Sequence, residues 1–423
     1  MTVDKLLNGV QNCSCGKNHI CPIDKVIISD DAFSILPSAT KNYNNILLVA
    51  DNNTFAIAGE RVKNTLRDKV KNVIVFDRQG ILVPDEVAIS ELEFALKQTA
   101  DCDLILGVGS GVINDLCKIV SFNNKLPYYI FATAPSMDGY ASKGSALILN
   151  GMKVTLTADV PKAIIADVNV LKDAPFEMIQ AGYGDIIGKF SCLNDWLLAK
   201  VVLGEYFCQF IYNETLNIAK ETILLADGLK NREKTAVGKL MTALVAVGVF
   251  MAYVGKTRPA SGSEHHLSHF FEIVGVLKGE EYLSHGIDVL YSAIETAKVR
   301  ESLLKLDNIN NYVWAHDSQK YQRDIQGIYG SLSNEIFALQ EKQNSYKVDR
   351  VSIYKQKWQE ICEVLRQAPS TNKMIELTNN VGLSYEDFIK FYGEEKISKA
   401  VDYAKDLKDR YTVLWLNADL KGL

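Results

Sequence analysis

The spacing of apolar residues divides the chain into two halves with different periods. Up to about residue 172, short apolar and β-branched runs alternate with helix-length stretches such as 56–70 and 86–100. This alternation predicts parallel strands joined by crossover helices, and hence an α/β fold. The expected strands cover residues 46–50, 73–76, 104–106, 128–131, 147–149, 154–156 and 164–166.

From about residue 173 onward, strand signals fade and long amphipathic stretches dominate. Glycine and proline breakers also become sparse, so this half is predicted to be a helical domain. The predicted boundary between the two domains lies at residues 173–175. The expected helices cover residues 212–229, 235–254, 283–300 and 348–367, and residues 370–423 are helical and charged without an assigned role.

Composition narrows the class of protein without naming a function. Hydrophobic residues make up 48% of the 423 residues and charged residues 23%, as in ordinary soluble globular proteins. The formal net charge of -5 argues against a nucleic-acid partner. The longest apolar run, 240–255, is shorter than the roughly 20 residues of a membrane span, so a buried helix and no membrane partner are expected. Residues 1–10 carry no signal-peptide pattern, which favours a cytoplasmic location.

The eight cysteines fall into two groups. Three of them, Cys13, Cys15 and Cys21, cluster with His19 near the start of the chain. These residue types can bind a metal, but their spacing matches no established zinc module, so a surface hairpin is the preferred interpretation. The other five are scattered among apolar neighbours and are predicted to be reduced core thiols: Cys102, Cys117, Cys192, Cys208 and Cys362.

A glycine-rich turn joins the expected strand 104–106 to the next helix. Gly107, Gly109 and Gly111 let the backbone approach a phosphate closely, and the free N–H groups of the following helix favour negative charge. The spacing differs from the GxGxxG fingerprint of dinucleotide-binding folds, so a simple tight turn remains the alternative.

Two further segments follow expected strands, where open α/β sheets bind their ligands. Asp51 follows strand 46–50, and it can accept hydrogen bonds from an adenosine ribose and repel a 2′-phosphate. The alternative role of Asp51 is that of a turn residue. The second segment follows strand 128–131 and contains Thr133, Ala134, Pro135 and Ser136, and then Asp138, Gly139 and Ser142. The alternative role of this segment is a turn that caps the next helix.

The histidines are the most informative residues of the chain. Four of the six lie between positions 265 and 285. His265 and His269 are four residues apart, so they share one face of the predicted helix. His266 points about 100° away from them, which predicts a packing or surface role.

The fourth histidine, His285, opens the next predicted helix and can lean onto the preceding one. Two imidazoles from successive helices and one carboxylate form a three-ligand site for a catalytic Zn²⁺ or a similar transition metal. Asp185 is the preferred carboxylate because it lies among glycines and apolar residues, with a helix N-cap as its alternative role. Glu264 is the competing ligand. Packing roles for the histidines stay open, and spacing alone does not say which of them bind a metal.

A family resemblance rests on five segments taken together: GVGSGVINDLCK (107–118), TAPSMDGYASKGSALI (133–148), AGYGDIIGK (181–189), RPASGSEHHLSH (258–269) and SHG (284–286). Over roughly residues 26 to 300, the chain resembles the sn-glycerol-1-phosphate dehydrogenases in their bacterial form. These enzymes lie within the superfamily of iron-type alcohol dehydrogenases, glycerol dehydrogenases and dehydroquinate synthases. The resemblance implies a Rossmann-like N-terminal domain with a mostly parallel sheet and an all-α C-terminal domain, with the active site between them. The N-terminal domain would cover residues 1–172, with an N-terminal extension at 1–25, and the C-terminal domain would cover residues 173–423.

The resemblance also implies roles for individual residues. Asp185, His265 and His285 would bind the metal, and Asp138, Asp185 and His269 would contact the substrate, with Asp138 and His269 as catalytic residues. The pyrophosphate of the cofactor would contact Gly109, Ser110, Gly111, Val112 and Ile113, the nicotinamide half Thr133, Ala134, Pro135, Ser136 and Ser142, and the adenosine half Asp51. Arg258 and Lys189 are candidates for binding a substrate phosphate, because both are cationic and close in sequence to the ligands.

The implied reaction is the reduction of a small molecule, dihydroxyacetone phosphate, to sn-glycerol 1-phosphate. NAD(H) or NADP(H) would supply the hydride, with Asp51 favouring NADH, and one divalent ion (Zn²⁺, Ni²⁺ or Fe²⁺) would act as a Lewis acid. A homo-oligomer, a dimer or larger, and a place in phospholipid biosynthesis are also expected. The alternatives are an NAD-dependent dehydrogenase of an unphosphorylated polyol such as glycerol, a dehydroquinate-synthase-like enzyme, and a non-catalytic protein that binds nucleotide and metal. The aspartate at position 185 argues against the second of these, because that group has a glutamate as its first ligand.

Overall fold

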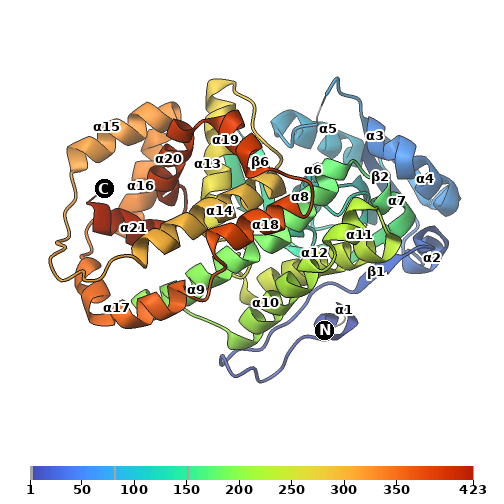
Figure 1. The fold of residues 1–423 in the computed structure, drawn as a ribbon. Helices are drawn as coiled ribbons and strands as arrows, with labels where there is room; N and C mark the ends of the chain where they lie inside the picture. Colours follow the sequence, from blue (N-terminus) through green and yellow to red (C-terminus); the bar gives the residue numbers. More distant parts are fainter. Residues whose placement is uncertain (1–2, 81, 150–151, 423) are drawn as a thin grey trace. The chain divides into compact units, whose positions relative to one another are not determined.

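The chain divides into two compact units, each built from two segments (Figure 1). The computed structural model describes residues 3–80, 82–149 and 152–422. Unit 1 comprises Met1–Ile186 and Leu224–Thr257, and unit 2 comprises Ile187–Ile223 and Arg258–Leu423. The sequence instead predicts a single boundary at 173–175. The division differs because helix α12 (Lys234–Val254), from the helical half, packs on elements of the first half, among them η3 (Asp138–Ala141) and α7 (Val168–Lys172).

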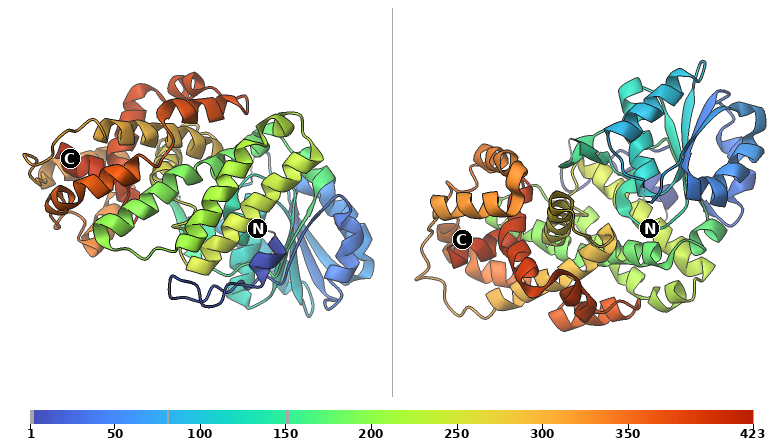
Figure 2. Two further views of the ribbon diagram at one scale, coloured as in Figure 1. Left: turned by 60° about the horizontal axis from the view of Figure 1, so that its bottom comes forward. Right: turned by 90° about the horizontal axis from the view of Figure 1, so that it is seen from above.

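Unit 1 contains a six-stranded parallel sheet with helices on both faces, which the right view of Figure 2 shows. The strand order is β1-β8-β5-β4-β2-β3, and each neighbouring pair is parallel. The six strands are β1 (Lys25–Ser29), β2 (Ile46–Asp51), β3 (Val70–Phe76), β4 (Leu104–Gly109), β5 (Tyr128–Ala132) and β8 (Ala163–Asp167). Two more strands, β6 (Gly144–Leu149) and β7 (Met152–Thr157), form a separate antiparallel pair.

The seven strands expected from the sequence are all present as β2 to β8, most of them a few residues longer than expected. Their parallel pairing in the main sheet confirms the predicted α/β alternation. The described strand that the sequence did not predict is β1, whose five residues are all only partly buried. A short, half-buried strand at the edge of a sheet has a weak hydrophobic pattern, which explains the omission.

The helices of unit 1 follow the strands along the chain. The predicted helices 86–100 and 56–70 are both present, the first as α5 (Glu86–Lys97). The second is a continuous helical stretch whose consecutive segments are α3 (Asn52–Thr54), the π-helical η1 (Phe55–Gly59), α4 (Glu60–Leu66) and the 3-10 turn η2 (Arg67–Lys69). The other helices of this unit are α1 (Val3–Leu7), α2 (Ala32–Ala39), α6 (Gly111–Asn124), α8 (Phe176–Ile187) and α11 (Ala226–Lys230).

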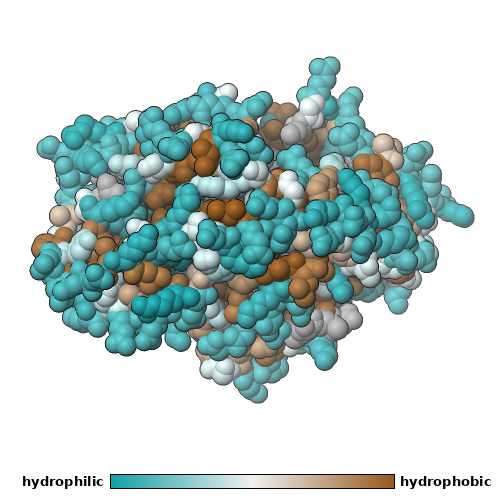
Figure 3. All heavy atoms as spheres, in the orientation of Figure 1, coloured by the Kyte–Doolittle hydropathy of each residue, from teal (hydrophilic) through white to brown (hydrophobic). Residues whose placement is uncertain are grey.

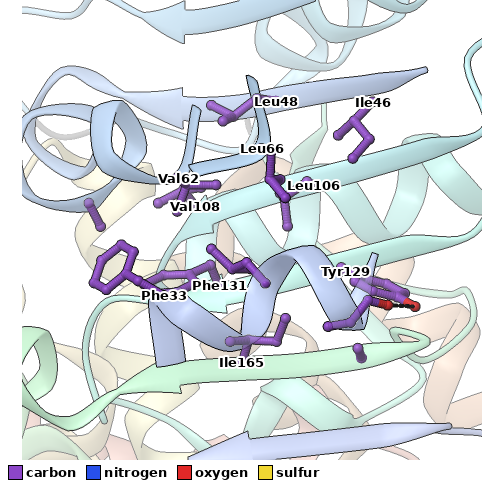
Figure 4. Close-up of a cluster of buried hydrophobic side chains, with 14 of the residues drawn as sticks. Phe33, Ile46, Leu48, Val62, Leu66, Leu106, Val108, Tyr129, Phe131 and Ile165 are labelled. Atoms are coloured by element: carbon purple, nitrogen blue, oxygen red, sulfur yellow. Dashed lines mark hydrogen bonds between the residues drawn. The ribbon is translucent and has the colours of Figure 1, made fainter. Parts of the chain in front are cut away.

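One core of unit 1 lies between the sheet and the helices α2 and α4 (Figure 4). Leu48, Leu106 and Phe131 extend from three neighbouring strands into this core, and Phe33 of α2 packs on Phe131 with ring centroids 4.8 Å apart. Helices cover both faces of the sheet, so a central strand such as β4 is buried at every position. This burial is why the central strands have continuous apolar runs in the sequence.

Helix α12 is the one helix in the described part of the chain that is long and apolar enough to cross a membrane. Of its most apolar window, 72% is buried inside the structure. A core helix shows the same composition, so the predicted buried helix is confirmed. On the face drawn in Figure 3, hydrophobic residues form small groups between hydrophilic ones.

Every element that the structure describes in unit 2 is helical. Helices α13 (Ser263–Lys278) and α14 (His285–Leu303) pack against each other, and the predicted helical tail is present as α18 to α21. The other helices are α9 (Lys189–Leu203), α10 (Gln209–Ile223), α15 (Ser318–Tyr329), η4 (Gly330–Leu332), α16 (Ser333–Gln343), α17 (Val351–Leu365), α18 (Thr371–Asn379), α19 (Tyr385–Tyr392), α20 (Glu394–Tyr403), η5 (Ala404–Leu407) and α21 (Val413–Lys421).

The segment that precedes β1 forms a closed loop, visible in dark blue in the left view of Figure 2. An antiparallel bridge joins Val10 to His19, as the predicted hairpin requires. The surface location predicted for this segment is wrong for His19, however, because its side chain is fully buried. Cys13 and Cys15 are partly buried.

Candidate functional site

The glycine turn of unit 1 leaves a helix N-terminus without a side-chain cap. Strand β4 ends at Gly109, and α6 begins at Gly111 with Ser110 as its N-cap residue, whose side chain makes no capping hydrogen bond. A Cβ atom on Gly109 would lie 2.6 Å from the Cβ of Ile113, so the chain can turn this tightly only with glycine. Uncapped amide groups at the start of a helix bind anions such as a pyrophosphate.

The second predicted cofactor segment lies beside this turn. Strands β4 and β5 are neighbours with Gly109 opposite Ala132, and the N–H of Thr133 donates to the carbonyl oxygen of Gly109 over 3.1 Å. The structure therefore brings residues 109–113 and 133–136 together at the carboxyl edge of the sheet. Parallel α/β sheets bind nucleotides at this edge.

A buried lysine, which was not among the predicted functional residues, holds the segment that follows β5 in place. The Nζ atom of Lys118 donates to the carbonyl oxygens of Gly139 (3.0 Å) and Gly144 (2.8 Å), and it lies 3.4 Å from a carboxylate oxygen of Asp115. Burial lowers the pKa of Lys118, although the charge of Asp115 opposes this shift. Ser142 also donates to the carbonyl oxygen of Gly139, over 3.1 Å. The signal was present in the sequence, since a lysine on the apolar face of a helix must find internal partners.

Two predicted substrate contacts, Asp138 and Asp185, lie together in unit 1. The backbone N–H of Asp138 donates to Oδ2 of Asp185 over 2.9 Å, and both side chains are buried. A Cβ atom on Gly182 of α8 would lie 1.8 Å from the carbonyl oxygen of Pro135, so the glycine lets α8 approach the segment 133–136. Asp185 lies near the end of α8, not at its start, so the N-cap alternative is wrong.

Asp51 ends β2 and caps the helix that follows. Its Oδ1 accepts the backbone N–H of Thr54 over 2.8 Å, and its own N–H donates to the Thr54 hydroxyl over 3.1 Å, which completes a capping box. Strand β2 pairs with β4, so Asp51 stands at the same sheet edge as the glycine turn. The capping role is compatible with the predicted contact to an adenosine ribose.

Three of the four clustered histidines face one another in unit 2. The ring centroids of His265 and His285 are 5.1 Å apart, those of His269 and His285 are 5.6 Å apart, and those of His265 and His269 are 6.4 Å apart. His266 is fully buried, and burial together with nearby cations lowers its pKa well below the ordinary value. It therefore stays neutral, in agreement with the packing role predicted from the helix face.

Two neighbours orient the predicted histidine ligands. Oε1 of Glu264 lies 2.6 Å from Nδ1 of His265 and accepts the N–H of Gly262 over 2.9 Å. Burial raises the pKa of Glu264, but its hydrogen bond with His265 and the charge of that ring outweigh burial and hold the pKa below its ordinary value. The hydroxyl of Ser268 lies 3.3 Å from Nδ1 of His285. An imidazole engaged at Nδ1 keeps Nε2 as its basic nitrogen, so this geometry favours Glu264 as a partner that orients His265 over Glu264 as a competing ligand.

A buried charge network fixes the start of α13. Asp195 of α9 accepts the N–H of Ser263 over 2.7 Å and pairs with Arg300 of α14 over 2.9 Å. It also accepts the N–H of Val413, at the start of α21, over 3.0 Å. This network is not predictable from the sequence, because Asp195 and Arg300 are 105 residues apart and no local pattern marks either residue.

Comparison with known proteins identifies the family. The family described as iron-containing alcohol dehydrogenase matches residues 32–175. A glycerol-1-phosphate dehydrogenase of Geobacillus thermodenitrificans (strain NG80-2), named for NAD(P)+, is 29% identical over 391 residues, which cover 90% of this chain and 88% of that protein. The enzyme of the same name from Geobacillus stearothermophilus is 31% identical over 299 residues, which cover 68% of this chain and 72% of that protein. The chain belongs to the glycerol-1-phosphate dehydrogenase family.

This member of the glycerol-1-phosphate dehydrogenase family shares its fold with solved structures. A probable glycerol dehydrogenase from Sinorhizobium meliloti 1021 matches with a TM-score of 0.60 at 15% identity, covering 94% of this chain and 96% of that chain. At this identity the match shows the fold alone. It confirms the predicted class, an α/β domain followed by a helical one.

The C-terminal tail of this family member, which the sequence left without a role, packs behind the histidine helices. The hydroxyl of Tyr392 donates to Asp288 of α14 over 2.9 Å and accepts the N–H of Leu283 over 3.0 Å. The ring of Tyr392 stacks on Phe271 of α13, with centroids 4.1 Å apart. Leu283 lies two residues before His285, so the tail holds the turn that presents this histidine.

The two cations predicted to bind a substrate phosphate have internal partners. The guanidinium of Arg258 donates to both carboxylate oxygens of Glu205, over 2.7 and 2.5 Å. Lys189 is buried, and its Nζ atom donates to the carbonyl oxygen of Ala260 over 2.9 Å. A bidentate ion pair and a buried contact to the backbone are structural roles, so the geometry does not favour either residue as a phosphate ligand.

Proposed function

We propose that this protein reduces dihydroxyacetone phosphate to sn-glycerol 1-phosphate with NADH or NADPH as the hydride donor. The names of its relatives in the glycerol-1-phosphate dehydrogenase family support both the substrate and the cofactor. The observation that carries the proposal is the group of three histidine rings in unit 2, in which Glu264 and Ser268 hold two of the rings by Nδ1.

We infer that Asp185, His265 and His285 bind one divalent metal ion. The donor types fit, because each imidazole is engaged at Nδ1 and keeps Nε2 as its basic nitrogen, while Asp185 adds a buried carboxylate. Nitrogen and oxygen donors of this kind suit Zn²⁺, Ni²⁺ or Fe²⁺. A metal ion bound there would polarise the carbonyl group of the substrate as a Lewis acid.

The carboxyl edge of the sheet in unit 1 is the proposed cofactor site. Residues 109–113 would bind the pyrophosphate through amide groups at the start of α6, and Asp51 would bind the adenosine ribose. Thr133, Ala134, Pro135, Ser136 and Ser142 would contact the nicotinamide half, which supplies the hydride to the carbonyl carbon of the substrate. The Asp51 carboxylate repels a 2′-phosphate, so we expect NADH to be preferred over NADPH.

His269 is the proposed proton donor. Hydride addition to the carbonyl carbon leaves an alkoxide on the former carbonyl oxygen, and this oxygen must take one proton to give the alcohol. The ring of His269 lies in the same histidine group as His265 and His285 and is only partly buried, so it can exchange protons with solvent. Asp138 is the proposed contact for a substrate hydroxyl, because it lies beside Asp185 at the sheet edge.

Initial rates of NADH oxidation by the purified protein test the proposal. The substrates are dihydroxyacetone phosphate and, at equal concentration, dihydroxyacetone, which lacks the phosphate. We expect turnover with the first and little with the second, and sn-glycerol 1-phosphate as the enantiomer formed. A preference for dihydroxyacetone would identify a polyol dehydrogenase instead. Binding of NADH and metal without turnover of any ketose phosphate would identify a non-catalytic protein.

Three wider features belong to the same proposal. The enzyme would act in the cytoplasm, supply the glycerol phosphate for phospholipid biosynthesis, and form a homo-oligomer of two or more copies. The composition supports the first of these, since it is that of an ordinary soluble protein. Sedimentation of the purified protein measures the oligomeric state, and a single species at the monomer mass, 47.1 kDa, would exclude the oligomer.

A further inference from the structure

Three potential metal ligands converge in the N-terminal loop of unit 1, which the proposed reaction does not use. Cys13, Cys15 and His19 each offer one donor atom, and these atoms lie within 4.8 Å of one another. The Sγ atom of Cys15 is 3.4 Å from Nε2 of His19. Two thiols and one imidazole at such distances match the donor set of structural zinc sites.

The backbone of this loop is closed in a way that holds the donors together. Val10 and His19 exchange two backbone hydrogen bonds of 2.8 Å each, which fixes both ends of the loop. Within it, the N–H of Gly16 donates to the carbonyl oxygen of Cys13 over 2.9 Å, and Gly16 has a φ of +82°, which favours glycine. The side-chain oxygen of Asn18 accepts the N–H of Asn12 over 2.8 Å. The loop is therefore folded around its cysteines by internal hydrogen bonds.

The imidazole of His19 is held as a metal ligand would be. It is fully buried and stacks on Tyr253 at the end of α12, with centroids 5.3 Å apart and an interplanar angle of 18°. Its Nδ1 atom lies 3.5 Å from the carbonyl oxygen of Tyr253. A carbonyl oxygen only accepts hydrogen bonds, so this contact places the proton on Nδ1 and leaves the lone pair on Nε2, toward Cys15.

We propose that Cys13, Cys15 and His19 bind a structural Zn²⁺ ion. Soft thiolate donors favour Zn²⁺ over the hard cations Mg²⁺ and Ca²⁺. This site shares no residue with the proposed catalytic metal site.

The site would anchor the start of the chain to α12 within unit 1. The hydroxyl of Tyr253 donates to the carbonyl oxygen of Leu6, so one tyrosine contacts both α1 and the histidine ligand. Because metal binding contributes directly to the folding free energy of small segments, loss of the ion would loosen the residues before β1.

Metal analysis of the full-length chain tests the proposal. The His265→Ala background removes a ligand of the proposed catalytic metal, so that the remaining zinc reports on the N-terminal loop. We expect one zinc per chain in this background, and none after the additional change Cys13→Ser or Cys15→Ser. Cys21→Ser is the matched control, because this thiol lies in the same segment outside the cluster and should leave the zinc in place.

Two outcomes would overturn the site. One is an unchanged zinc content in the Cys13→Ser and Cys15→Ser variants. The other is a disulfide between Cys13 and Cys15, detected by mass spectrometry after alkylation of the purified native protein. A chelator should also make residues 3–21 sensitive to limited proteolysis in the wild-type protein, and equal resistance with and without chelator would contradict the anchoring role.

Cobalt substitution tests the thiolate ligands by a second readout. A thiolate bound to Co²⁺ gives a charge-transfer absorption whose intensity grows with the number of thiolates, here two in the proposed set. Cys13→Ser and Cys15→Ser should each lower this intensity, whereas Cys21→Ser should not change it. An unchanged intensity in Cys13→Ser and Cys15→Ser would refute these residues as ligands. Turnover of dihydroxyacetone phosphate measured in parallel keeps failure of this site distinct from failure of the proposed function.

Discussion

Units 1 and 2 form their binding residues in opposite ways. In unit 1, the proposed anion site consists of backbone: Gly109 ends a strand, Gly111 begins a helix, and the Ser110 side chain leaves the amide groups uncapped. In unit 2, the two proposed histidine ligands of the metal are side chains, and His265 is held by a hydrogen bond to Glu264. One site follows from local backbone conformation, and the other depends on side chains that other residues orient.

The difference decides how far each site depends on the rest of the chain. The turn at Gly109 involves strand β4 and helix α6, which are consecutive in the sequence. The histidine site is supported by Asp195, Arg300 and Tyr392, which come from three separate helices. A substitution far from the site in sequence should therefore affect the histidines more than the glycine turn.

The largest expected effect comes from removing a proposed metal ligand. His265→Ala should lower kcat by about a thousandfold or more, because loss of a Lewis acid removes several kcal/mol of transition-state stabilisation. Metal content and initial rates with dihydroxyacetone phosphate measure this effect. His266→Leu is the control: its ring is neutral, and neither ring nitrogen has a hydrogen-bond partner in the described part of the structure. Retention of both metal and turnover in His265→Ala would refute the ligand assignment.

The next largest effect is on stability. It tests whether the pair of Asp195 and Arg300, which are distant in sequence, holds the start of α13. Asp195→Ala leaves the buried Arg300 without its charge partner, and breaking a buried pair typically costs about 3 to 4 kcal/mol of unfolding free energy. Denaturant unfolding measures this cost. Lys373→Ala, which breaks an exposed pair with Glu376, should change stability by less than about 0.5 kcal/mol. Equal effects of the two substitutions would mean that the network does not hold α13.

The same contrast explains how much of the molecule could be predicted from its sequence. Buried strands such as β4 were predictable because every residue is covered on both faces and the apolar run is continuous. The shared face of His265 and His269 followed from the helical period alone. The assignment of Asp185 came from the family resemblance, and its role as a metal ligand remains a prediction.

What the sequence did not show depends on contacts between distant residues. Tyr392 and Asp288 are 104 residues apart, and neither residue type indicates that the tail holds the turn before His285. The division into units was also hidden, because the apolar pattern of α12 predicts burial but not the elements against which the helix packs. Lys118 was predictable in part. Its position on the apolar face of a helix indicates that it has internal partners, but the sequence does not show which residues these are.

A substitution in the glycine turn should have a smaller and local effect. In Gly109→Ala, the new Cβ would lie 2.6 Å from the side chain of Ile113, and overpacking of this kind costs about 1 to 3 kcal/mol. We expect the KM for NADH to rise about tenfold, which corresponds to 1.4 kcal/mol, with metal content unchanged. Gly238→Ala is the matched control in unit 1, because its Cβ would lie 3.5 Å from Val168, an ordinary contact. A loss of metal in Gly109→Ala would show that the two sites are not independent.

The tail contact should have a moderate effect on the histidine site. Tyr392→Phe keeps the stack on Phe271 and removes the hydroxyl bound to Asp288 and Leu283. Because it leaves a buried carboxylate with one fewer donor, we expect about 1 to 2 kcal/mol of destabilisation. Metal affinity should fall about tenfold, as for other residues that orient a ligand. Equilibrium dialysis against zinc measures the affinity, and an unchanged value would confine Tyr392 to packing.

The smallest expected effect concerns Asp51, where the capping and cofactor roles can be separated. Asparagine is as good an N-cap as aspartate but carries no charge, so Asp51→Asn should keep the cap on Thr54 and lose the repulsion of a 2′-phosphate. We expect the ratio of kcat/KM for NADH to that for NADPH to fall by roughly tenfold, which corresponds to 1.4 kcal/mol. Asp51→Ala should shift the ratio similarly and also cost about 1 kcal/mol of stability through the lost cap. If neither variant changes the ratio while Asp51→Ala still loses stability, Asp51 acts only as a cap, and the cofactor site of unit 1 rests on its backbone alone.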